Sequence, residues 1–183
     1  MTAYLVLLRG INVGGRNNVP MADLRAVLED VGFSNVSTYI ASGNVLLDSD
    51  LSAAKVASTI EAALPKAFRL QSELVRIAVL SRAELEAVVK ARPRGFGDQP
   101  AKYHSDAIFL MGIDSVDAMA VFSPRDGVDT VWPGDGVIYS QRLSAERTKS
   151  RLNRIMTSPA YASMTIRSWQ TTLALLELMR KRK

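Results

Sequence analysis

The stretch VSTYIASGNVLLD, residues 36–48, decides the fold. It contains two runs of β-forming residues, 36–41 and 45–48, on either side of the tripeptide SGN. Because glycine between two such runs tolerates the positive φ of a tight turn, the stretch predicts a β-hairpin. Two adjacent antiparallel strands are therefore expected at this point of the chain.

An apolar strand and a helix are predicted before the hairpin. Residues 4–8 are an unbroken apolar run, which is typical of a buried strand. Pro20 suits the first turn of a helix, and Gly32 suits its end. Between them, apolar residues recur at helical spacing: Met21, Leu24, Val27, Leu28 and Val31.

A second helix and a further strand are predicted after the hairpin. Residues 51–64 indicate an alanine-rich helix that ends at Pro65, with Asp50 or Ser52 as its N-cap. Residues 74–80 then return as a strand, which completes the order βαββαβ. Such split-βαβ units form antiparallel sheets with helices on one face.

The same order of elements is predicted again in the second half. Ser81 and Glu84 form a capping-box pattern and predict a linking helix over 82–91. Residues 92–102 are rich in proline and glycine and indicate a boundary. The elements expected after it are strands over 106–111, 130–132, 137–140 and 164–167, and helices over 115–122, 146–156 and 169–179.

The fold class expected is therefore α+β, with two consecutive split-βαβ (ferredoxin-like, βαββαβ) modules and a C-terminal helix. The first module covers residues 1–80 and the second covers residues 103–183. Residues 81–102 supply a linking helix and a loop.

Composition excludes several kinds of site. The 183 residues include no cysteine, which excludes disulfides, zinc–thiolate sites and thiol nucleophiles. His104 is the single histidine, and no G-x-S-x-G nucleophile elbow occurs. Asp48 and Asp50 could hold Mg²⁺, but a capping role is favoured, so no metal and no cofactor is expected. The N-terminal apolar run is too short for a signal peptide or a membrane span, which favours a cytoplasmic protein without a membrane partner.

The loop LRGINVGGRNNVP, residues 8–20, allows two interpretations. Its glycines do not match G-x-G-x-x-G, and Arg16 and Asn17 replace the lysine and hydroxyl of a P-loop. Glycines let backbone N–H groups converge on an anion, with Arg9 and Arg16 to supply charge. Alternatively, the loop is only a tight turn that needs positive φ. Spacing alone does not decide between them.

The C-terminal part is basic. From Arg142 onward lie ten of the 23 basic residues but only two of the 18 acidic ones, which suggests an anionic partner. The helix predicted over 146–156 would carry Arg147, Arg151 and Arg154 on one face. The last four residues, RKRK, are expected to be an unstructured tail.

The stretch TIRSWQTTL, residues 165–173, predicts a second strand-to-helix corner. Arg167 ends the strand, Ser168 is the expected N-cap, and the helix begins at Trp169. An arginine beside a helix N-terminus is suited to bind an anion.

Four stretches together resemble one bacterial family: LLRGINVGGRNNVPMADLRAVLEDVGF, TYIASGNVLLDS, KSRLN and TIRSWQTTLALLEL. The chain is similar to the family known as Domain of Unknown Function 1697 over nearly its whole length. That family usually shows Thr-x-Arg-Asn-Trp-Asn-Thr near its C-terminus, where this chain has Ser168 and Gln170 in place of the asparagines. The resemblance implies two split-βαβ modules and no established activity.

The leading hypothesis is a protein that binds a small phosphorylated or otherwise anionic ligand, with Arg9 and Arg167 brought to one hollow. Arginines would neutralise charge, glycines would present N–H groups, and Asn12 and Asn44 would read polar edges. The candidate ligand-binding residues are Arg9, Asn12, Gly14, Gly15, Ser42, Asn44, Ser150, Arg151, Arg167, Trp169 and Thr171.

Two alternatives remain open. A nucleic-acid-binding module would use the basic C-terminal part, although RNA-reading sheets need aromatic residues on their central strands, where only Phe109 and Tyr139 are available. A scaffold protein without a ligand is the other. The sequence decides neither the oligomeric state nor whether the protein is an enzyme.

Overall fold

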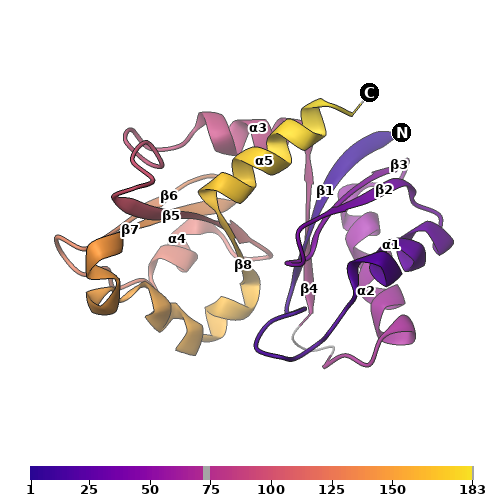
Figure 1. Ribbon diagram of the computed structural model, residues 1–183, viewed down its shortest axis with the longest axis horizontal. Helices are drawn as coiled ribbons and strands as arrows, with labels where there is room; N and C mark the ends of the chain where they lie inside the picture. Colours follow the sequence, from indigo (N-terminus) through magenta and orange to yellow (C-terminus); the bar gives the residue numbers. More distant parts are fainter. Residues whose placement is uncertain (72–74, 183) are drawn as a thin grey trace. The chain divides into compact units, whose positions relative to one another are not determined.

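The structure is a computed structural model that describes residues 1–71 and 75–182. Its contacts divide the chain into two compact units. Unit 1 comprises Met1–Leu85 and Leu175–Lys183, and unit 2 comprises Glu86–Ala174. Each unit contains one four-stranded antiparallel sheet (Figure 1). The α+β class predicted from the sequence is confirmed.

Unit 1 follows the predicted order of elements. They are β1 (Thr2–Arg9), α1 (Met21–Asp30), β2 (Ser34–Tyr39), β3 (Asn44–Ser49), α2 (Ala53–Ala67) and β4 (Arg76–Ser81). The strand order in the sheet is β2-β3-β1-β4. In β2 and β3, Tyr39 pairs with Asn44, so the predicted hairpin is confirmed. The predicted strand start at Leu74 lies outside the described residues.

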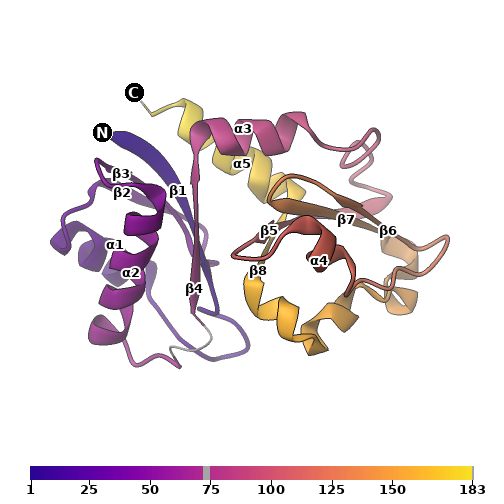
Figure 2. The same cartoon turned by 180° about the vertical axis from the view of Figure 1, so that it is seen from behind.

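The side chains of β1 point alternately to the two faces of the sheet, and those on one face contribute to the core of unit 1. Tyr4, Val6 and Leu8 pack in one apolar cluster with residues of β3, α1 and α2. Both helices lie on this side of the sheet (Figures 1 and 2). Leu5 and Leu7 point to the opposite face and are also fully buried. Both faces of β1 are therefore covered, which explains its unbroken apolar run.

Helix α2 continues past its predicted end. Ser52 is its N-cap, as predicted, and the Ser52 side chain accepts a hydrogen bond from Lys55 N. Pro65 lies inside the helix, and the last turn closes where Phe68 N donates to Leu64 O at 2.9 Å. The prediction that Pro65 ends the helix was wrong because a proline removes only its own N–H donor, and the next residues can still complete the turn.

Unit 2 begins within α3 (Arg82–Lys90), whose predicted capping box is formed: Ser81 N donates to Glu84 Oε2 at 2.7 Å. The strands of unit 2 are β5 (Tyr103–Leu110), β6 (Asp129–Pro133), β7 (Val137–Leu143) and β8 (Met164–Ser168), in the sheet order β6-β7-β5-β8. The helical segments are α4 (Ser115–Met119), the 3₁₀ helices η2 (Ser144–Lys149), η3 (Leu152–Thr157) and η4 (Pro159–Ser163), and the start of α5 (Trp169–Arg180), which belongs to unit 1 from Leu175 onward.

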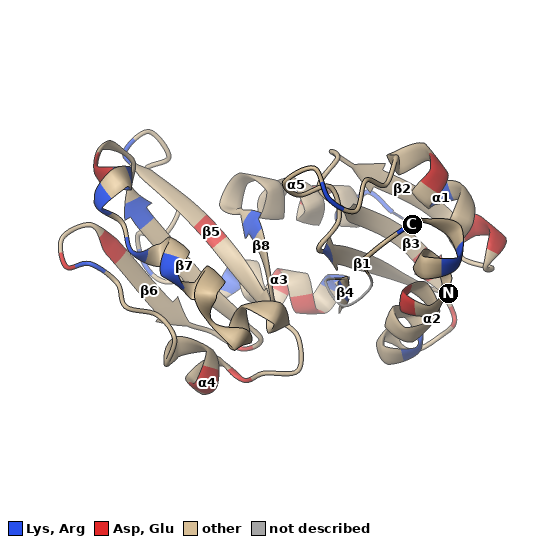
Figure 3. Cartoon of the chain, turned by 90° about the horizontal axis from the view of Figure 1, so that it is seen from below, with Lys and Arg blue, Asp and Glu red and all other residues tan. Residues whose placement is uncertain are grey.

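The basic helix predicted over 146–156 is not formed. Two 3₁₀ helices, η2 and η3, replace it, and Ser150 between them has an extended ψ of 143°. Asp129 causes the break, because its Oδ2 accepts hydrogen bonds from Arg151 N at 2.8 Å and from Arg125 N at 2.9 Å. Figure 3 shows basic positions at the end of β7 and in the chain that follows it.

The prediction of an arginine stripe on that helix is therefore wrong. Arg147 lies in η2, Arg151 lies in the break, and Arg154 lies in η3. Without a continuous α-helix, the spacing of i, i+4 and i+7 no longer places the three side chains on one face.

The C-terminal tail is docked rather than unstructured as far as Arg182, and Lys183 lies outside the described residues. Arg182 Nε lies 3.4 Å from Asp48 Oδ1, and its Nη1 donates to Ser37 Oγ at 3.3 Å. Its Nη2 donates to the backbone oxygen of Asn35, whose side chain in turn donates to Asp48. The Arg182 side chain is only 9% exposed. The expectation of a free tail was wrong because Asp48 and the edge strand β2 supply partners from far away in sequence.

We expect Arg182→Ala to lower the free energy of unfolding by about 1–2 kcal/mol, because charged hydrogen bonds of a shielded guanidinium are lost. Urea denaturation followed by circular dichroism measures the change. The matched control is Lys181→Ala, which removes an exposed charge and should cost less than about 0.5 kcal/mol. Equal effects of the two substitutions would contradict the docking role of Arg182.

Candidate functional site

In the loop between β1 and α1, Gly14 and Gly15 form the centre of a hairpin turn. Arg16 N donates to Val13 O at 3.0 Å, and the central residues Gly14 and Gly15 have φ of 58° and 73°. Positive φ at both central positions is what a type I′ turn requires, and glycine adopts it without strain. The tip of the turn is exposed to solvent. The interpretation as a tight turn therefore accounts for both glycines.

Two asparagines brace this loop. Asn12 Nδ2 donates to Val19 O at 2.9 Å and to Ala41 O at 3.0 Å. Asn17 Nδ2 donates to Gly10 O at 2.7 Å, and its Oδ1 accepts from Gln71 N at 2.8 Å. Asn12 therefore uses its amide N–H groups to hold the loop, and its role as a ligand contact stays a prediction.

The β2–β3 turn is held in a similar way. Asn44 is fully buried, and its Nδ2 donates to Tyr39 O at 3.0 Å and to Ser42 Oγ at 2.9 Å. Leu8 N donates to Gly43 O at 2.8 Å, which joins this turn to the end of β1. The two loops therefore meet at the end of β1. The amide N–H groups of Asn44 are used inside the hairpin, and its role as a ligand contact stays a prediction.

The second predicted corner, in unit 2, has a different construction. Strand β8 passes directly into α5, and Thr171 N donates to Ser168 Oγ at 3.2 Å. Ser168 Oγ itself donates to Thr171 Oγ1 at 2.9 Å. Ser168 is thus the N-cap that the sequence predicted, and Thr171 is bound to that cap. The other N–H groups of the first turn have no acceptor within the helix.

A cavity of about 220 Å³ lies at this corner. Its wall is formed by the loop before β5, the start of β5 and the start of α5: Gly97, Pro100, Tyr103, His104, Ser105, Ser168, Trp169 and Gln170. The cavity exists because β5 begins at Tyr103 but pairs with β8 only from Asp106 onward. Since one water occupies about 30 Å³ in the liquid, the cavity has room for a phosphate-sized group.

Trp169 forms the rigid side of the cavity. The residue is 3% exposed, and its ring packs edge-on against Phe96 at 5.0 Å and Tyr139 at 6.3 Å between centroids. Its Nε1 is buried and has no hydrogen-bond partner within the described part of the chain. A Cβ added to Gly97 would lie 2.6 Å from this nitrogen, so the N–H edge faces the Gly97 side of the wall. A buried donor without an acceptor costs about 1–3 kcal/mol.

His104 and Asp106 form a pair at the edge of the cavity. His104 Nε2 lies 3.1 Å from Asp106 Oδ1, and the two side chains are 45% and 15% exposed. Burial raises the pKa of Asp106, and the charges of His104 and Arg142 act in the opposite direction. Asp106 itself lines a separate cavity of about 50 Å³, with Ser140, Arg142 and Asn153.

Arg167 lies on β8 next to the cap residue Ser168. Its Nη1 donates to Thr165 Oγ1 at 2.9 Å and to Ile166 O at 2.8 Å. Burial lowers the pKa of Arg167 to about 10, so the guanidinium is still charged at neutral pH. It is not one of the residues that form the cavity wall. Its role as a ligand-binding residue therefore stays a prediction.

The remaining predicted residues are distributed over both units. Ser150 Oγ accepts a hydrogen bond from Leu152 N, and Arg151 is held through its backbone by Asp129. Arg9 ends β1, in unit 1, opposite Arg76 of β4. Because Arg9 and Arg167 belong to different units, the prediction that they share one hollow stays a prediction.

The aromatic residues that an RNA-reading sheet would need are in the core. Phe109 and Tyr139 are buried, and Tyr139 Oη donates to Val88 O at 2.6 Å. Burial also raises the pKa of Tyr139. These rings cannot stack on bases without unpacking the unit, so the nucleic-acid alternative loses the aromatic platform it requires.

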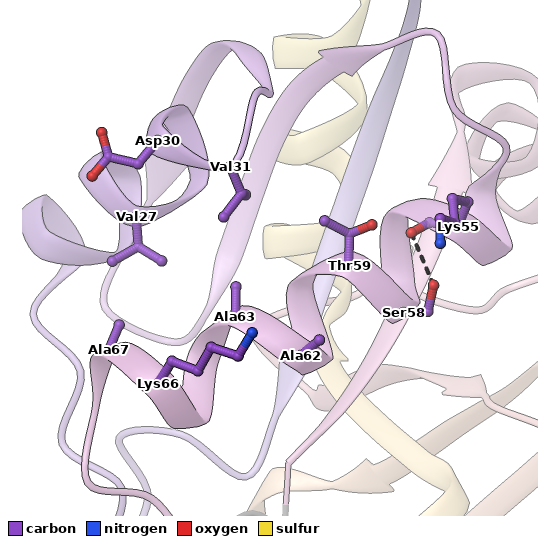
Figure 4. Close-up of a pocket in the computed structure, with 10 residues that line it drawn as sticks. All are labelled: Val27, Asp30, Val31, Lys55, Ser58, Thr59, Ala62, Ala63, Lys66 and Ala67. Carbon is purple, nitrogen blue, oxygen red and sulfur yellow. Dashed lines mark hydrogen bonds between the residues drawn. The ribbon is translucent and has the colours of Figure 1, made fainter.

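A larger hollow of about 630 Å³ lies in unit 1, between α1 and α2. Figure 4 shows its floor of small side chains, with Val27 on α1 and Val31 just after α1 facing Ala63 and Ala67 on α2. Its charged groups, Asp30, Lys55 and Lys66, are spread along the groove in Figure 4 and do not converge on one point. A ligand site needs a few convergent polar groups, so the cavity in unit 2 is the stronger candidate.

Residues 1–71 and 75–182 lack two further features. No three metal-ligating side chains of the His, Cys, Asp or Glu type come close enough together there to hold a metal ion. In the same residues, no helix has both the length and the apolar character that crossing a membrane requires.

Comparison with known proteins gives a family and a related structure. The family model described as "Protein of unknown function (DUF1697)" matches residues 1–139. The solved structure of conserved bacterial protein SP0830 from Streptococcus pneumoniae is similar over 97% of this chain and 98% of its own chain. The two are 27% identical in sequence, with a TM-score of 0.81. No curated protein matches this chain.

We expect Asn17→Gly to lower the free energy of unfolding by about 1–3 kcal/mol more than Asn18→Gly, because Gly10 O and Gln71 N lose their partner. Glycine retains the positive φ of 48° at position 17, so the substitution tests the side-chain amide. The exposed neighbour Asn18 is the matched control for backbone entropy. Chemical denaturation measures both variants, and equal losses would show that Asn17 does not brace the loop.

The free energy of unfolding is expected to depend on pH through the carboxyl group of Asp106. Since its pKa is raised in the folded protein, the folded carboxyl binds a proton more tightly than the unfolded one. The stability this provides is present below the ordinary pKa and is lost as pH rises through the folded pKa. Asp106→Asn should therefore raise the free energy of unfolding near neutral pH, and the gain should shrink as pH approaches 4.

Urea denaturation at both pH values measures this gain. Asp117→Asn, at an exposed position of α4, is the matched control and should change stability by less than about 0.5 kcal/mol. A loss of stability in Asp106→Asn at neutral pH would show that the ionised carboxylate is net favourable, contrary to the burial argument.

Proposed function

The chain belongs to the DUF1697 family of proteins of unknown function, and from this premise we propose that unit 2 binds a small anionic ligand of the phosphate or phosphorylated class. The ligand occupies the cavity at the start of α5. One observation carries the proposal: Trp169 lines a cavity large enough for an anion, and its buried Nε1 has no acceptor among the described residues.

The chemistry of the cavity wall supports an anion. Tyr103 supplies a hydroxyl donor and the amide of Gln170 adds further N–H groups, whereas the hydroxyls of Ser105 and Ser168 donate inside the chain, to Gln141 Oε1 and Thr171 Oγ1. None of the eight wall residues is acidic. The start of α5 adds the positive end of a helix dipole and its unbonded N–H groups.

The departures from the family motif are compatible with this role. Ser168 caps α5 and also lines the cavity, and Gln170 keeps a side-chain amide where the family usually has asparagine. We also propose that each unit is a split-βαβ module, since the second, third, first and fourth strands of each unit are neighbours in that order. The boundaries 1–80 and 103–183 belong to the same proposal.

Titration with inorganic phosphate near neutral pH tests the proposal. The readout is the indole N–H signal of Trp169 in proton–nitrogen NMR spectra, which Trp169→Phe identifies among the signals of the two tryptophans. We expect this signal to shift in a saturable way, because the ligand supplies the missing acceptor. The signal of Trp132 should stay in place.

Gln170→Glu is the decisive variant. A carboxylate in the first turn stabilises a helix, so the fold should be kept, but it should weaken phosphate binding about tenfold through like-charge repulsion. Thr148→Glu makes the same charge change at an exposed position of η2, outside the cavity wall, and should bind like the original protein. Absence of a saturable shift, or equal weakening in both variants, would overturn the proposed site.

A further inference from the structure

His104 is the single histidine of the chain, and it stands between two cavities. It lines the larger cavity together with Trp169, Ser168 and Gln170. Its ring nitrogen Nε2 is 3.1 Å from Asp106 Oδ1, and Asp106 lines the smaller cavity behind it. A half-exposed imidazole is therefore held by a mostly buried carboxylate at the edge of the proposed ligand site.

The charged groups around this pair are arranged unevenly. On β7, Arg142 pairs across the sheet with His104, and on β6, Asp129 is opposite Arg142 in turn. In the loop before β5, Lys102 Nζ lies 5.1 Å from the centre of the Tyr103 ring, and Arg92 is paired with Asp98 at 3.0 Å. The first turn of α5 contains no acidic residue. Asp106 is thus the carboxylate in contact with His104.

We propose that His104 determines which anion this site binds: in its protonated form it selects oxyanions that carry two negative charges, such as phosphate monoesters, over singly charged ones. This inference rests on the proposed function of the same cavity. Asp106 is a positioning residue, because it accepts a hydrogen bond from Nε2 and thereby directs the other ring nitrogen, Nδ1, to the ligand.

The physical basis is the number of donors on the ring. A neutral imidazole has one N–H, which the contact with Asp106 occupies, so Nδ1 is then an acceptor and repels an oxyanion. Protonation turns Nδ1 into a donor and adds a positive charge at the cavity. Binding of a dianion is therefore coupled to uptake of one proton, and affinity rises as pH falls.

Sulfate is the suitable probe, because it remains a dianion throughout the range in which imidazoles titrate. We expect its affinity, measured by the indole signal of Trp169, to be at least about fivefold higher at about pH 6 than at about pH 8. His104→Gln should still bind sulfate but with the same affinity at both pH values. At the lower pH, nitrate, which carries a single negative charge, should bind more weakly than sulfate to the original protein. The same difference should be absent in His104→Gln.

The variant Asp106→Asn separates positioning from charge. Its side-chain oxygen still accepts from Nε2, so sulfate binding and a pH dependence should both persist, while Asp106→Ala should lose most of the pH dependence.

The outcomes distinguish the two proposals. Sulfate binding that is independent of pH, or a pH dependence that His104→Gln retains, would overturn this inference and leave the proposed function standing. No saturable shift with sulfate or with phosphate at either pH would overturn both.

Discussion

Each unit depends on a central strand that is hydrogen-bonded on both sides. In unit 1, β1 pairs with β3 and β4 over nearly its whole length. In unit 2, β5 pairs with β7 from Tyr103 onward, but its pairing with β8 begins only at Asp106. Within the described chain, the backbone of residues 103–105 therefore lacks a neighbouring strand on that side. The start of α5 comes to lie there instead, and the cavity follows from this difference in strand length.

The two strand-to-helix corners differ in how their polar groups are bonded within the chain. In unit 1 a long loop separates β1 from α1, and the side chains of Asn12 and Asn17 turn inward to bond its backbone. In unit 2 no loop separates β8 from α5, so only Ser168 is available to cap the helix. The first corner satisfies its own polar groups. The second leaves donors at a hollow, which is the property a binding site needs.

Local chemistry explains which features could be predicted from the sequence. The hairpin at residues 36–48, the capping box at Ser81 and the N-cap at Ser168 each depend on residues at most a few positions apart. Features that failed depend on distant partners. Asp129 breaks the expected basic helix across a separation of 22 residues, and Asp48 of β3, far away in sequence, holds Arg182.

For the same reason, only half of the candidate site could be predicted from the sequence. The corner at Arg167, Ser168 and Trp169 is a local motif, and the sequence indicated it. The other wall of the cavity comes from Gly97 and Pro100, which lie in the predicted boundary segment, and from His104, which the sequence analysis noted only as the single histidine. No spacing rule relates those positions to Trp169, because their proximity is set by the pairing of β5 with β8.

Trp169 packs edge-on against Phe96 and Tyr139, and phenylalanine could supply such a ring without a buried N–H. Among the described residues, the indole N–H has no acceptor, and a buried donor in that state costs about 1–3 kcal/mol, a large share of the roughly 5–15 kcal/mol by which proteins are typically stable. The proposed function accounts for this cost, because a bound oxyanion would accept a hydrogen bond from the indole.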